Sequence, residues 1–211
     1  MQLVCLDLEG VLVPEIWIEF AERTGISELR RTTRDEPDYD KLMKYRLDLL
    51  RQHKLGLRDI REVISGTRPL PGAKEFLDTL RRDFQVIILS DTFYEFAMPL
   101  MEQLGMPTLM CHKLEADATG MLVDYHLRMP NQKMEAVRRF KEINFRVIAA
   151  GDSYNDTAML AEADAGILFS PPQNVIDEFP QFPVTQNYAE LRTEIDKAMA
   201  SFLHRSGQHG Y

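Results

Sequence analysis

Residues 1–13 read MQLVCLDLEGVLV, an apolar run that ends in two acidic residues, Asp7 and Glu9. The run does not alternate polar with apolar positions, a pattern typical of a strand buried on both faces of a parallel sheet. Residues two apart on a strand project to the same side. We therefore expect Asp7 and Glu9 to point together from the end of a buried first strand, before Gly10 turns the chain away.

Similar runs recur along the chain and set the fold class. Three more continuous apolar segments occupy residues 86–89, 147–150 and 165–169. Stretches with helical spacing flank them, at residues 72–82, 94–104, 131–143 and 153–163. Strands that alternate with helices predict an α/β fold with a doubly wound, mostly parallel, Rossmann-like sheet.

The long segment between the first two strands has a different character. Residues 14–68 carry apolar side chains at spacings suited to helix faces, among dense charges. We predict a helical cap over residues 14–68, inserted after the first strand of a core formed by residues 1–13 and 69–211. A small β-hairpin insertion is expected at residues 108–128, around the turn-like residues 117–120.

Composition narrows the classes of partner. The formal net charge is -8, so the chain lacks the basic stripe of a nucleic-acid binder, and a phosphate must be held by a metal or a few cations. No apolar stretch reaches membrane-spanning length and no signal peptide precedes the first strand, so we expect a cytoplasmic protein without membrane partners. Cys5 and Cys111 lie in apolar runs, which favours buried free thiols.

The ends of the expected strands carry the polar residues of interest. The first strand ends at Asp7, the second at Ser90 and Asp91, and the third at Asp152, four residues before Asp156. Ligands of open α/β sheets bind beyond the carboxyl ends of the strands. Crowded carboxylates repel each other, and a divalent cation relieves the repulsion. Because magnesium prefers oxygen ligands, this edge predicts a magnesium–phosphate site.

Each of these residues also has a purely structural interpretation. Asp7 can simply terminate a strand, and Ser153 with Asp156 matches a capping box at a helix start. Lys133 can be a solvated surface residue. Lys133 lies near the first turn of a helix, where a positive charge interacts unfavourably with the helix dipole by ~0.3–1 kcal/mol. A phosphate or carboxylate partner would remove that unfavourable interaction.

Four ordered motifs resemble those of the haloacid dehalogenase superfamily: residues 7–11 (DLEGV), Ser90, Lys133 and residues 151–156 (GDSYND). The helical cap, with Glu15, Arg46 and Ser90 at matching positions, is similar to that of the phosphoserine phosphatase branch. The resemblance implies a magnesium-dependent phosphoserine phosphatase of amino-acid biosynthesis that also transfers the phosphoryl group to homoserine. Because dimers are the commonest oligomers, a homodimer is the first assembly to test.

The resemblance also implies roles for individual residues. Asp7 would be the nucleophile that forms an aspartyl-phosphate, and Glu9 the general acid and base. Mg²⁺ would be held by Asp7, Asp152 and the backbone carbonyl of Glu9. The remaining residues would bind substrate or support the metal: Lys133, Ser90 and Asn155 at the phosphate, Asp156 behind the metal, Glu15 at an ammonium and Arg46 at a carboxylate. Surface ion pairing on helices is the bland alternative for Glu15 and Arg46.

Two residues depart from the usual pattern of the family. Glu9 stands where aspartate is usual, and the extra methylene suits an acceptor larger than water. Asp91 stands where glycine usually follows the serine of the second motif, and either faces the ammonium of an acceptor or points away. Two alternative functions remain: a phosphatase for another small phosphate ester, and a non-catalytic module that binds a phosphate ligand.

Overall fold

The computed structural model describes residues 1–32, 35, 36 and 38–206. In this part of the chain, seven strands form one sheet in the order β4-β3-β2-β1-β5-β6-β7. The strands are β1 Gln2–Leu6, β2 Gln85–Phe93, β3 Thr108–Ala116, β4 Leu122–His126, β5 Arg146–Gly151, β6 Ala165–Phe169 and β7 Val184–Thr185. All neighbours are parallel except β3 and β4. The predicted α/β fold with a mostly parallel sheet is confirmed.

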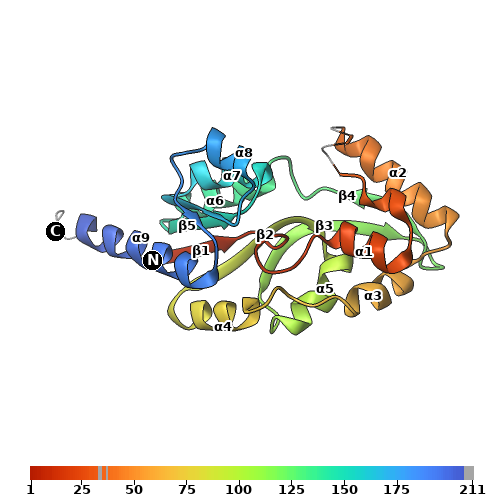
Figure 1. Ribbon diagram of the computed structural model, residues 1–211, viewed down its shortest axis with the longest axis horizontal. Coiled ribbons are helices and arrows are strands. Elements are labelled where there is room, and N and C mark those ends of the chain that lie inside the picture. Colours follow the sequence, from red (N-terminus) through yellow and green to blue (C-terminus); the bar gives the residue numbers. More distant parts are fainter. Residues whose placement is uncertain (33–34, 37, 207–211) are drawn as a thin grey trace.

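Helices cover both faces of the sheet (Figure 1). One face carries α6 Gln132–Glu142, α7 Tyr154–Glu162 and α8 Gln173–Glu178. The opposite face carries α4 Ala73–Asp83, α5 Tyr94–Gln103 and α9 Tyr188–Ser206. Each helix predicted in the core lies within two residues of its expected bounds, because its apolar positions repeat at helical spacing.

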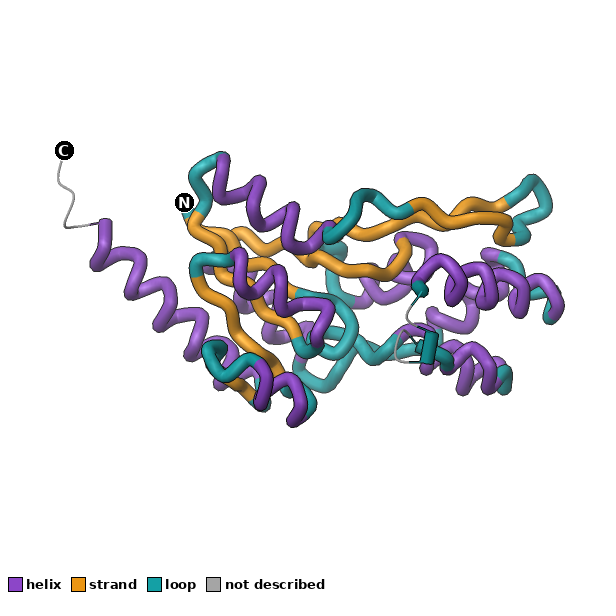
Figure 2. Tube along the Cα trace, turned by 90° about the horizontal axis from the view of Figure 1, so that it is seen from above, coloured by secondary structure: helices purple, strands orange, loops and turns teal. Residues whose placement is uncertain are grey.

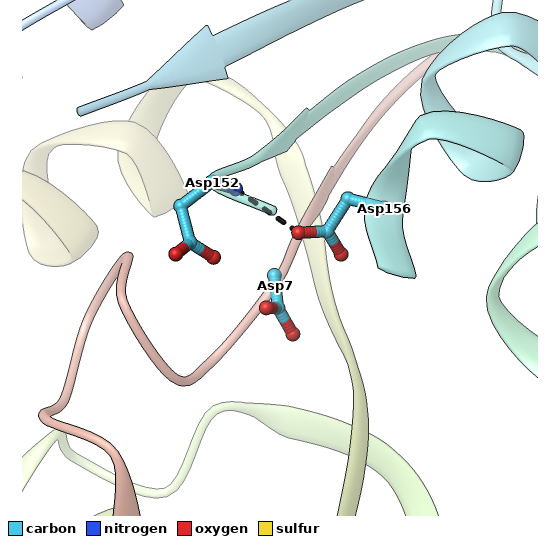
Figure 3. Close-up of side chains that lie close together, drawn as sticks. All are labelled: Asp7, Asp152 and Asp156. Atoms are coloured by element: carbon cyan, nitrogen blue, oxygen red, sulfur yellow. Dashed lines mark hydrogen bonds between the residues drawn. The ribbon is translucent and has the colours of Figure 1, made fainter. Parts of the chain in front are cut away.

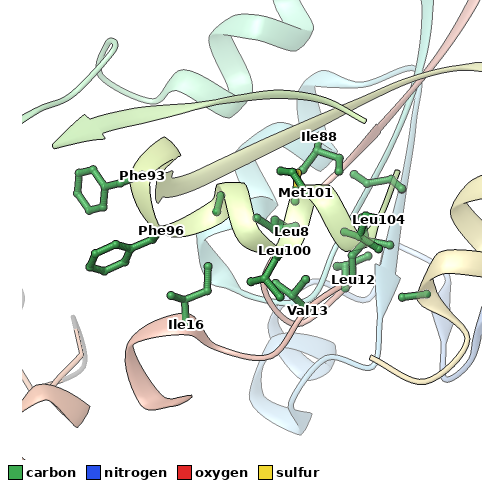
Figure 4. Close-up of a cluster of buried hydrophobic side chains, with 14 of the residues drawn as sticks. Leu8, Leu12, Val13, Ile16, Ile88, Phe93, Phe96, Leu100, Met101 and Leu104 are labelled. Atoms are coloured by element: carbon green, nitrogen blue, oxygen red, sulfur yellow. The ribbon is translucent and has the colours of Figure 1, made fainter. Parts of the chain in front are cut away.

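The first strand shows why its sequence is apolar throughout. Leu3 and Cys5 belong to the hydrophobic cluster under α6 and α7, whereas Val4 and Leu6 belong to the larger cluster on the other face. Leu8, beyond the strand, also packs into that larger cluster, beside Ile88 and Leu100 (Figure 4). Both faces of β1 are therefore buried. Leu8 points into this cluster and Asp7 points away from it, because successive side chains of an extended chain point in opposite directions.

The segment after β1 forms α1 Ile16–Thr24, the 3₁₀ helix Ser27–Arg30, α2 Tyr39–Gln52 and α3 Leu57–Ser65. These helices gather beside β3 and β4, at the end of the molecule away from the C-terminal helix (Figures 1 and 2). The Trp17 ring meets that of Phe96 edge-on, with centroids 4.7 Å apart. Tyr125 Oη donates to Asp40 Oδ1 at 2.7 Å, which joins β4 to α2. We propose that residues 14–68 form a cap on a core of residues 1–13 and 69–211.

Strands β3 and β4 form an antiparallel pair around a turn in which Gly120 N donates to the Asp117 carbonyl oxygen. Both strands are longer than the short runs visible in the sequence. The first half of β3 pairs in parallel with β2, and its second half pairs with β4. The hairpin is thus an extension of a strand of the main sheet. Its tip meets the cap, where Leu57 N donates to the Gly120 carbonyl oxygen at 2.8 Å.

Candidate active site

The carboxyl ends of β1, β2 and β5 converge on a pocket of about 140 Å³ beneath the cap. Nine of the ten residues singled out in the sequence line this pocket: Asp7, Glu9, Glu15, Arg46, Ser90, Asp91, Lys133, Asp152 and Asn155. The tenth, Asp156, is fully buried behind it. Residues from four motifs and from the cap therefore share one site.

Lys133 sits at the centre of the buried charges. Helix α6 begins at Gln132 after Asn131 in the left-handed conformation, with φ 48°, and this start directs Lys133 into the pocket. Lys133 Nζ lies 2.9 Å from Asp7 Oδ1, 2.9 Å from Asp156 Oδ1 and 3.5 Å from Asp91 Oδ2. These carboxylates outweigh the effect of burial and hold the pKa of Lys133 well above its usual range. The ammonium near the helix N-terminus is thus compensated by carboxylates.

Asp156 has a structural task as well as its contact with Lys133. Its Oδ2 accepts a hydrogen bond from the backbone N–H of Asp152 at 3.0 Å (Figure 3). It also accepts one from the backbone N–H of Ser153 at 3.1 Å, at the start of α7. A Cβ atom on Gly151 would lie 2.3 Å from Asp156 Cγ, so only glycine fits there. The segment Gly151–Asp156 therefore holds a buried carboxylate in one orientation, with both oxygens already accepting hydrogen bonds.

Three carboxylates face one another: oxygens of Asp7, Asp152 and Asp156 lie within 4.8 Å (Figure 3). Burial, followed by the charge of Asp156, raises the pKa of Asp152 to about 7, and the same two causes raise the pKa of Asp7. Within the described residues, no cationic side chain forms an ion pair with Asp152. A divalent cation would relieve this repulsion, and its preference for oxygen ligands matches the residues present.

Gly10 brings the chain close to this cluster. Its φ of 77° is in the left-handed region, and a Cβ atom there would lie 2.4 Å from Asp152 Oδ2. A side chain at position 10 would therefore displace the carboxylate of Asp152. Glycine serves both the turn after Glu9 and the close approach to the acidic cluster.

Glu9 lies beside Asp7 in the pocket and is anchored by the start of α1. Ile16 N donates to Glu9 Oε2 at 2.9 Å. Burial, and then the charge of Glu15, raises the pKa of Glu9 to about 7, while the Ile16 N–H and the Thr92 hydroxyl act in the opposite direction. A carboxyl group with a pKa near neutrality is suited to give and take a proton.

Arg46 brings an uncompensated cation to the same pocket. Its side chain is buried, and its Cζ lies 4.4 Å from the centroid of the Trp17 ring. Nη2 donates to the Arg31 carbonyl oxygen at 2.7 Å, Nε has no hydrogen-bond partner, and no carboxylate among the described residues pairs with the guanidinium. Burial lowers its pKa to about 10. A buried, unpaired guanidinium is suited to a carboxylate from outside the chain.

The carboxylate of Asp91 is surrounded by three side chains of the protein. Its carboxylate lies 3.7 Å from His112 Nε2, accepts from Gln132 Nε2 at 3.2 Å and faces Lys133. Burial alone would raise the pKa of Asp91, but the charge of Lys133 and the hydrogen bonds from His112 and Gln132 hold it well below its usual range. Asp91 therefore faces the protein's own cation rather than pointing away.

Several residues around the site were not predicted from the sequence, among them Thr92, Tyr39, His112 and Gln132. Thr92 and Tyr39 line the pocket, and His112 and Gln132 line a neighbouring cavity of about 380 Å³. Thr92 lies two residues after Ser90, a spacing visible in the sequence, and in the structure its N–H donates to Ser90 Oγ at 3.2 Å. A sequence signal also existed for Gln132, which precedes Lys133 at the start of a helix. Tyr39 and His112 carry no such local signal.

Two further predictions can be compared with the structure. Cys5 and Cys111 are buried free thiols, as expected. In the described part of the chain, every helix is too short or too polar to cross a lipid bilayer.

Comparison with known proteins places the chain in a family. The family model of haloacid dehalogenase-like hydrolases matches residues 1–164. The phosphoserine phosphatase ThrH of Pseudomonas aeruginosa is 62% identical over 203 residues, which cover 96% of this chain and 99% of that protein. A phosphoserine phosphatase of Pseudomonas syringae pv. tomato is 62% identical over 198 residues, or 94% of this chain and 84% of that one.

Solved structures agree on the fold. A phosphoserine phosphatase from T. onnurineus superposes with a TM-score of 0.65 at 27% identity, covering 90% of this chain and 92% of that one. A phospho-aspartyl intermediate analogue of phosphoserine phosphatase gives a TM-score of 0.73 at 19% identity, covering 92% and 98%. From the family match and the 62% identical relatives, the chain is an enzyme that belongs to the haloacid dehalogenase-like hydrolases.

Proposed function

We propose that this enzyme is a magnesium-dependent phosphoserine phosphatase that works through an aspartyl-phosphate and also transfers the phosphoryl group to homoserine. The observation that carries the proposal is the placement of the unpaired guanidinium of Arg46 in the same small pocket as the Asp7–Lys133 pair. The Asp7–Lys133 pair suits a phosphate ester and Arg46 suits a carboxylate, and phosphoserine carries both of these anionic groups. The names of the 62% identical relatives support this substrate.

The reaction proceeds in two displacements. A carboxylate oxygen of Asp7 attacks phosphorus, and the bond between phosphorus and the serine oxygen breaks while Glu9 gives a proton to that oxygen. Glu9 then takes a proton from water or from the hydroxyl of homoserine, whose oxygen attacks phosphorus as the bond to Asp7 breaks. Covalent catalysis divides one difficult displacement into two easier ones. A pKa of Glu9 near 7 suits both directions of proton transfer.

Other residues of the chain would position the substrate. Lys133 holds Asp7 at 2.9 Å and is close enough to neutralise a phosphate oxygen beside it. Ser90 and Asn155 line the same pocket and offer hydrogen bonds to the phosphate. Arg46 binds the carboxylate of the amino acid, and Glu15, which is exposed at the entrance, binds its ammonium.

The acidic cluster would hold the metal. Asp7, Asp152 and the backbone carbonyl of Glu9 are the proposed ligands, and Asp156 supports them by fixing Lys133 and the backbone of Asp152. Bound Mg²⁺ would neutralise the negative charge shared by the carboxylates and the phosphate. Asp91, held by Lys133 and His112, would tune the charge of the phosphate site from the side.

A product analysis tests the proposal. The enzyme is incubated with phosphoserine and Mg²⁺, with and without homoserine, and free phosphate and phosphohomoserine are counted. We expect free phosphate alone without homoserine, and both products with it. Turnover of p-nitrophenyl phosphate without turnover of phosphoserine would indicate a phosphatase for another small ester. Binding of phosphoserine without turnover of either ester would indicate a non-catalytic module.

A further inference from the structure

The Thr92 hydroxyl is a polar group in the pocket that the reaction scheme does not use. Thr92 is 3% exposed, and its Oγ1 is buried without a hydrogen-bond partner in the described residues. A buried hydroxyl that makes no hydrogen bond is rare, because burial removes it from water without compensation. Its position therefore calls for a partner within the pocket.

The backbone fixes where this hydroxyl lies. Thr92 belongs to the irregular end of β2, where the pairing with β3 shifts between Leu89 and Phe93. Its N–H donates to Ser90 Oγ, so the backbone of Thr92 is tied to a residue of the proposed phosphate site. Asp91, between them, is turned toward Lys133 and His112. Thr92 is thus held at the wall of the pocket that Glu9 also lines.

Glu9 is the group in the pocket that most needs a second anchor. The Ile16 N–H holds only Oε2 of its carboxylate. A glutamate has one more rotatable bond than an aspartate, so a single hydrogen bond leaves the carboxylate more freedom. Thr92 lines the same pocket as Glu9, and its hydroxyl acts to lower the pKa of that carboxyl group. The unpaired hydroxyl of Thr92 would supply a second hydrogen bond to Glu9 if it turns toward the carboxylate.

We propose that Thr92 is a positioning residue whose hydroxyl donates to the Glu9 carboxylate and, together with the Ile16 N–H, fixes Glu9 for proton transfer. The inference rests on the proposed role of Glu9. The position of Glu9 also affects whether water or the amino acid acts as the acceptor. The hydroxyl of an amino acid held by Arg46 and Glu15 can occupy only a narrow region, whereas water can approach the aspartyl-phosphate from several positions. Transfer should therefore depend on a fixed Glu9 more strongly than hydrolysis does.

The test compares Thr92→Val, which keeps the shape and removes the hydroxyl, with Thr92→Ser, which keeps the hydroxyl. Thr67→Val is the matched control, because Thr67 is 1% exposed and its hydroxyl also has no hydrogen-bond partner among the described residues, but Thr67 lies outside the pocket. Each change at position 92 is also made in a Glu9→Gln background. Equal unfolding temperatures show that the variants fold.

We expect Thr92→Val to lower kcat for phosphoserine about 10-fold, a fraction of the 10²–10⁴-fold effect typical of a general acid–base group. KM should change less than about threefold, since Thr92 would not bind the amino acid itself. Thr92→Ser should recover most of the loss, and Thr67→Val should have no effect. In the Glu9→Gln background, Thr92→Val should not lower kcat any further. The ratio of phosphohomoserine to free phosphate should fall in Thr92→Val.

Three results would overturn the inference: a kcat of Thr92→Val within about twofold of the wild type, an equal further loss in the Glu9→Gln background, or a Thr92→Ser variant as slow as Thr92→Val. The same variants at positions 92 and 9 are measured with p-nitrophenyl phosphate, because the aspartyl-phosphate that the enzyme forms from this ester must still be hydrolysed. If phosphoserine is not a substrate, the substrate assignment fails, yet this repeat still tests Thr92. If Glu9→Gln is fully active on both esters, the role of Glu9 fails and that of Thr92 with it.

Discussion

Replacement of Arg46 by methionine is expected to separate recognition of the substrate carboxylate from the chemistry at phosphorus. Arg46 lies in the cap, whereas Asp7 and Lys133 belong to the strand-end site, so the variant leaves the reacting groups in place. Methionine keeps an unbranched chain that can lie against the Trp17 ring. The lost interaction is the charge-assisted hydrogen bond from the guanidinium to the substrate.

The magnitude follows from what the guanidinium contacts. Among the described residues, Nη2 donates to the Arg31 carbonyl oxygen, Nη1 has the sulfur of Met43 as its hydrogen-bond partner at 3.9 Å, and Nε has no hydrogen-bond partner. Donors therefore remain free for a carboxylate. A hydrogen bond to a charged group contributes ~1.5–3 kcal/mol, which corresponds to a loss of about 10- to 150-fold in kcat/KM for phosphoserine.

The assay compares phosphoserine with phosphoethanolamine, which lacks the carboxylate. We expect kcat/KM for phosphoethanolamine to change less than about threefold. This substrate has no carboxylate for the Arg46 guanidinium to bind, so removal of the guanidinium removes no binding energy. Any cost of freeing the Arg31 carbonyl affects both substrates and cancels in their ratio. Arg51→Met is the control on the same helix, since Arg51 is exposed and pairs with Asp48. Equal losses for the two substrates would refute the assignment of Arg46 to the carboxylate.

Three further predictions concern the acidic site. Asp7→Asn should abolish turnover of phosphoserine without lowering the unfolding temperature, and activity within tenfold of wild type would exclude the aspartyl-phosphate route. Activity should require Mg²⁺ and be inhibited by Ca²⁺, which takes more oxygen ligands at longer distances; full activity in excess chelator would contradict the metal site. Gly151→Ala should displace Asp156, which lies 2.3 Å from the new Cβ position, and lower the free energy of unfolding in urea by ~1–3 kcal/mol; an unchanged urea midpoint would show that the segment adapts without strain.

The core of the fold and the strand-end residues could be predicted because their signals are local. An apolar run without alternation identifies a doubly buried strand, and the carboxyl ends of such strands meet at one edge of the sheet. That rule placed Asp7, Ser90 and Asp152 together before any contact was known. The helical spacing of residues 131–143 likewise predicted that Lys133 lies in the first turn of a helix, and α6 begins at Gln132.

The rest depends on packing between distant segments. One partner of Asp91 is His112, and the two meet because β3 lies beside β2 and extends past it. The free donors of Arg46 depend on the path of the cap, which brings the Arg31 carbonyl to one edge of the guanidinium. No residue near Arg46 in the sequence reveals that its guanidinium has no carboxylate partner among the described residues. The longer β2 strand, whose irregular end places Thr92, is likewise a result of pairing.

The aspartyl-phosphate itself offers the most direct test of the proposed mechanism. The enzyme is mixed with phosphoserine and Mg²⁺ and quenched in acid within the first turnover. It is then digested, and the mass of the peptide that contains Asp7 is measured by mass spectrometry. We expect one phosphoryl group on Asp7, which disappears with a homoserine chase as phosphohomoserine forms, and none in Asp7→Asn. A phosphoryl group on another residue, or none on Asp7 while phosphoserine is consumed under conditions that preserve acyl phosphates, would contradict the proposed mechanism.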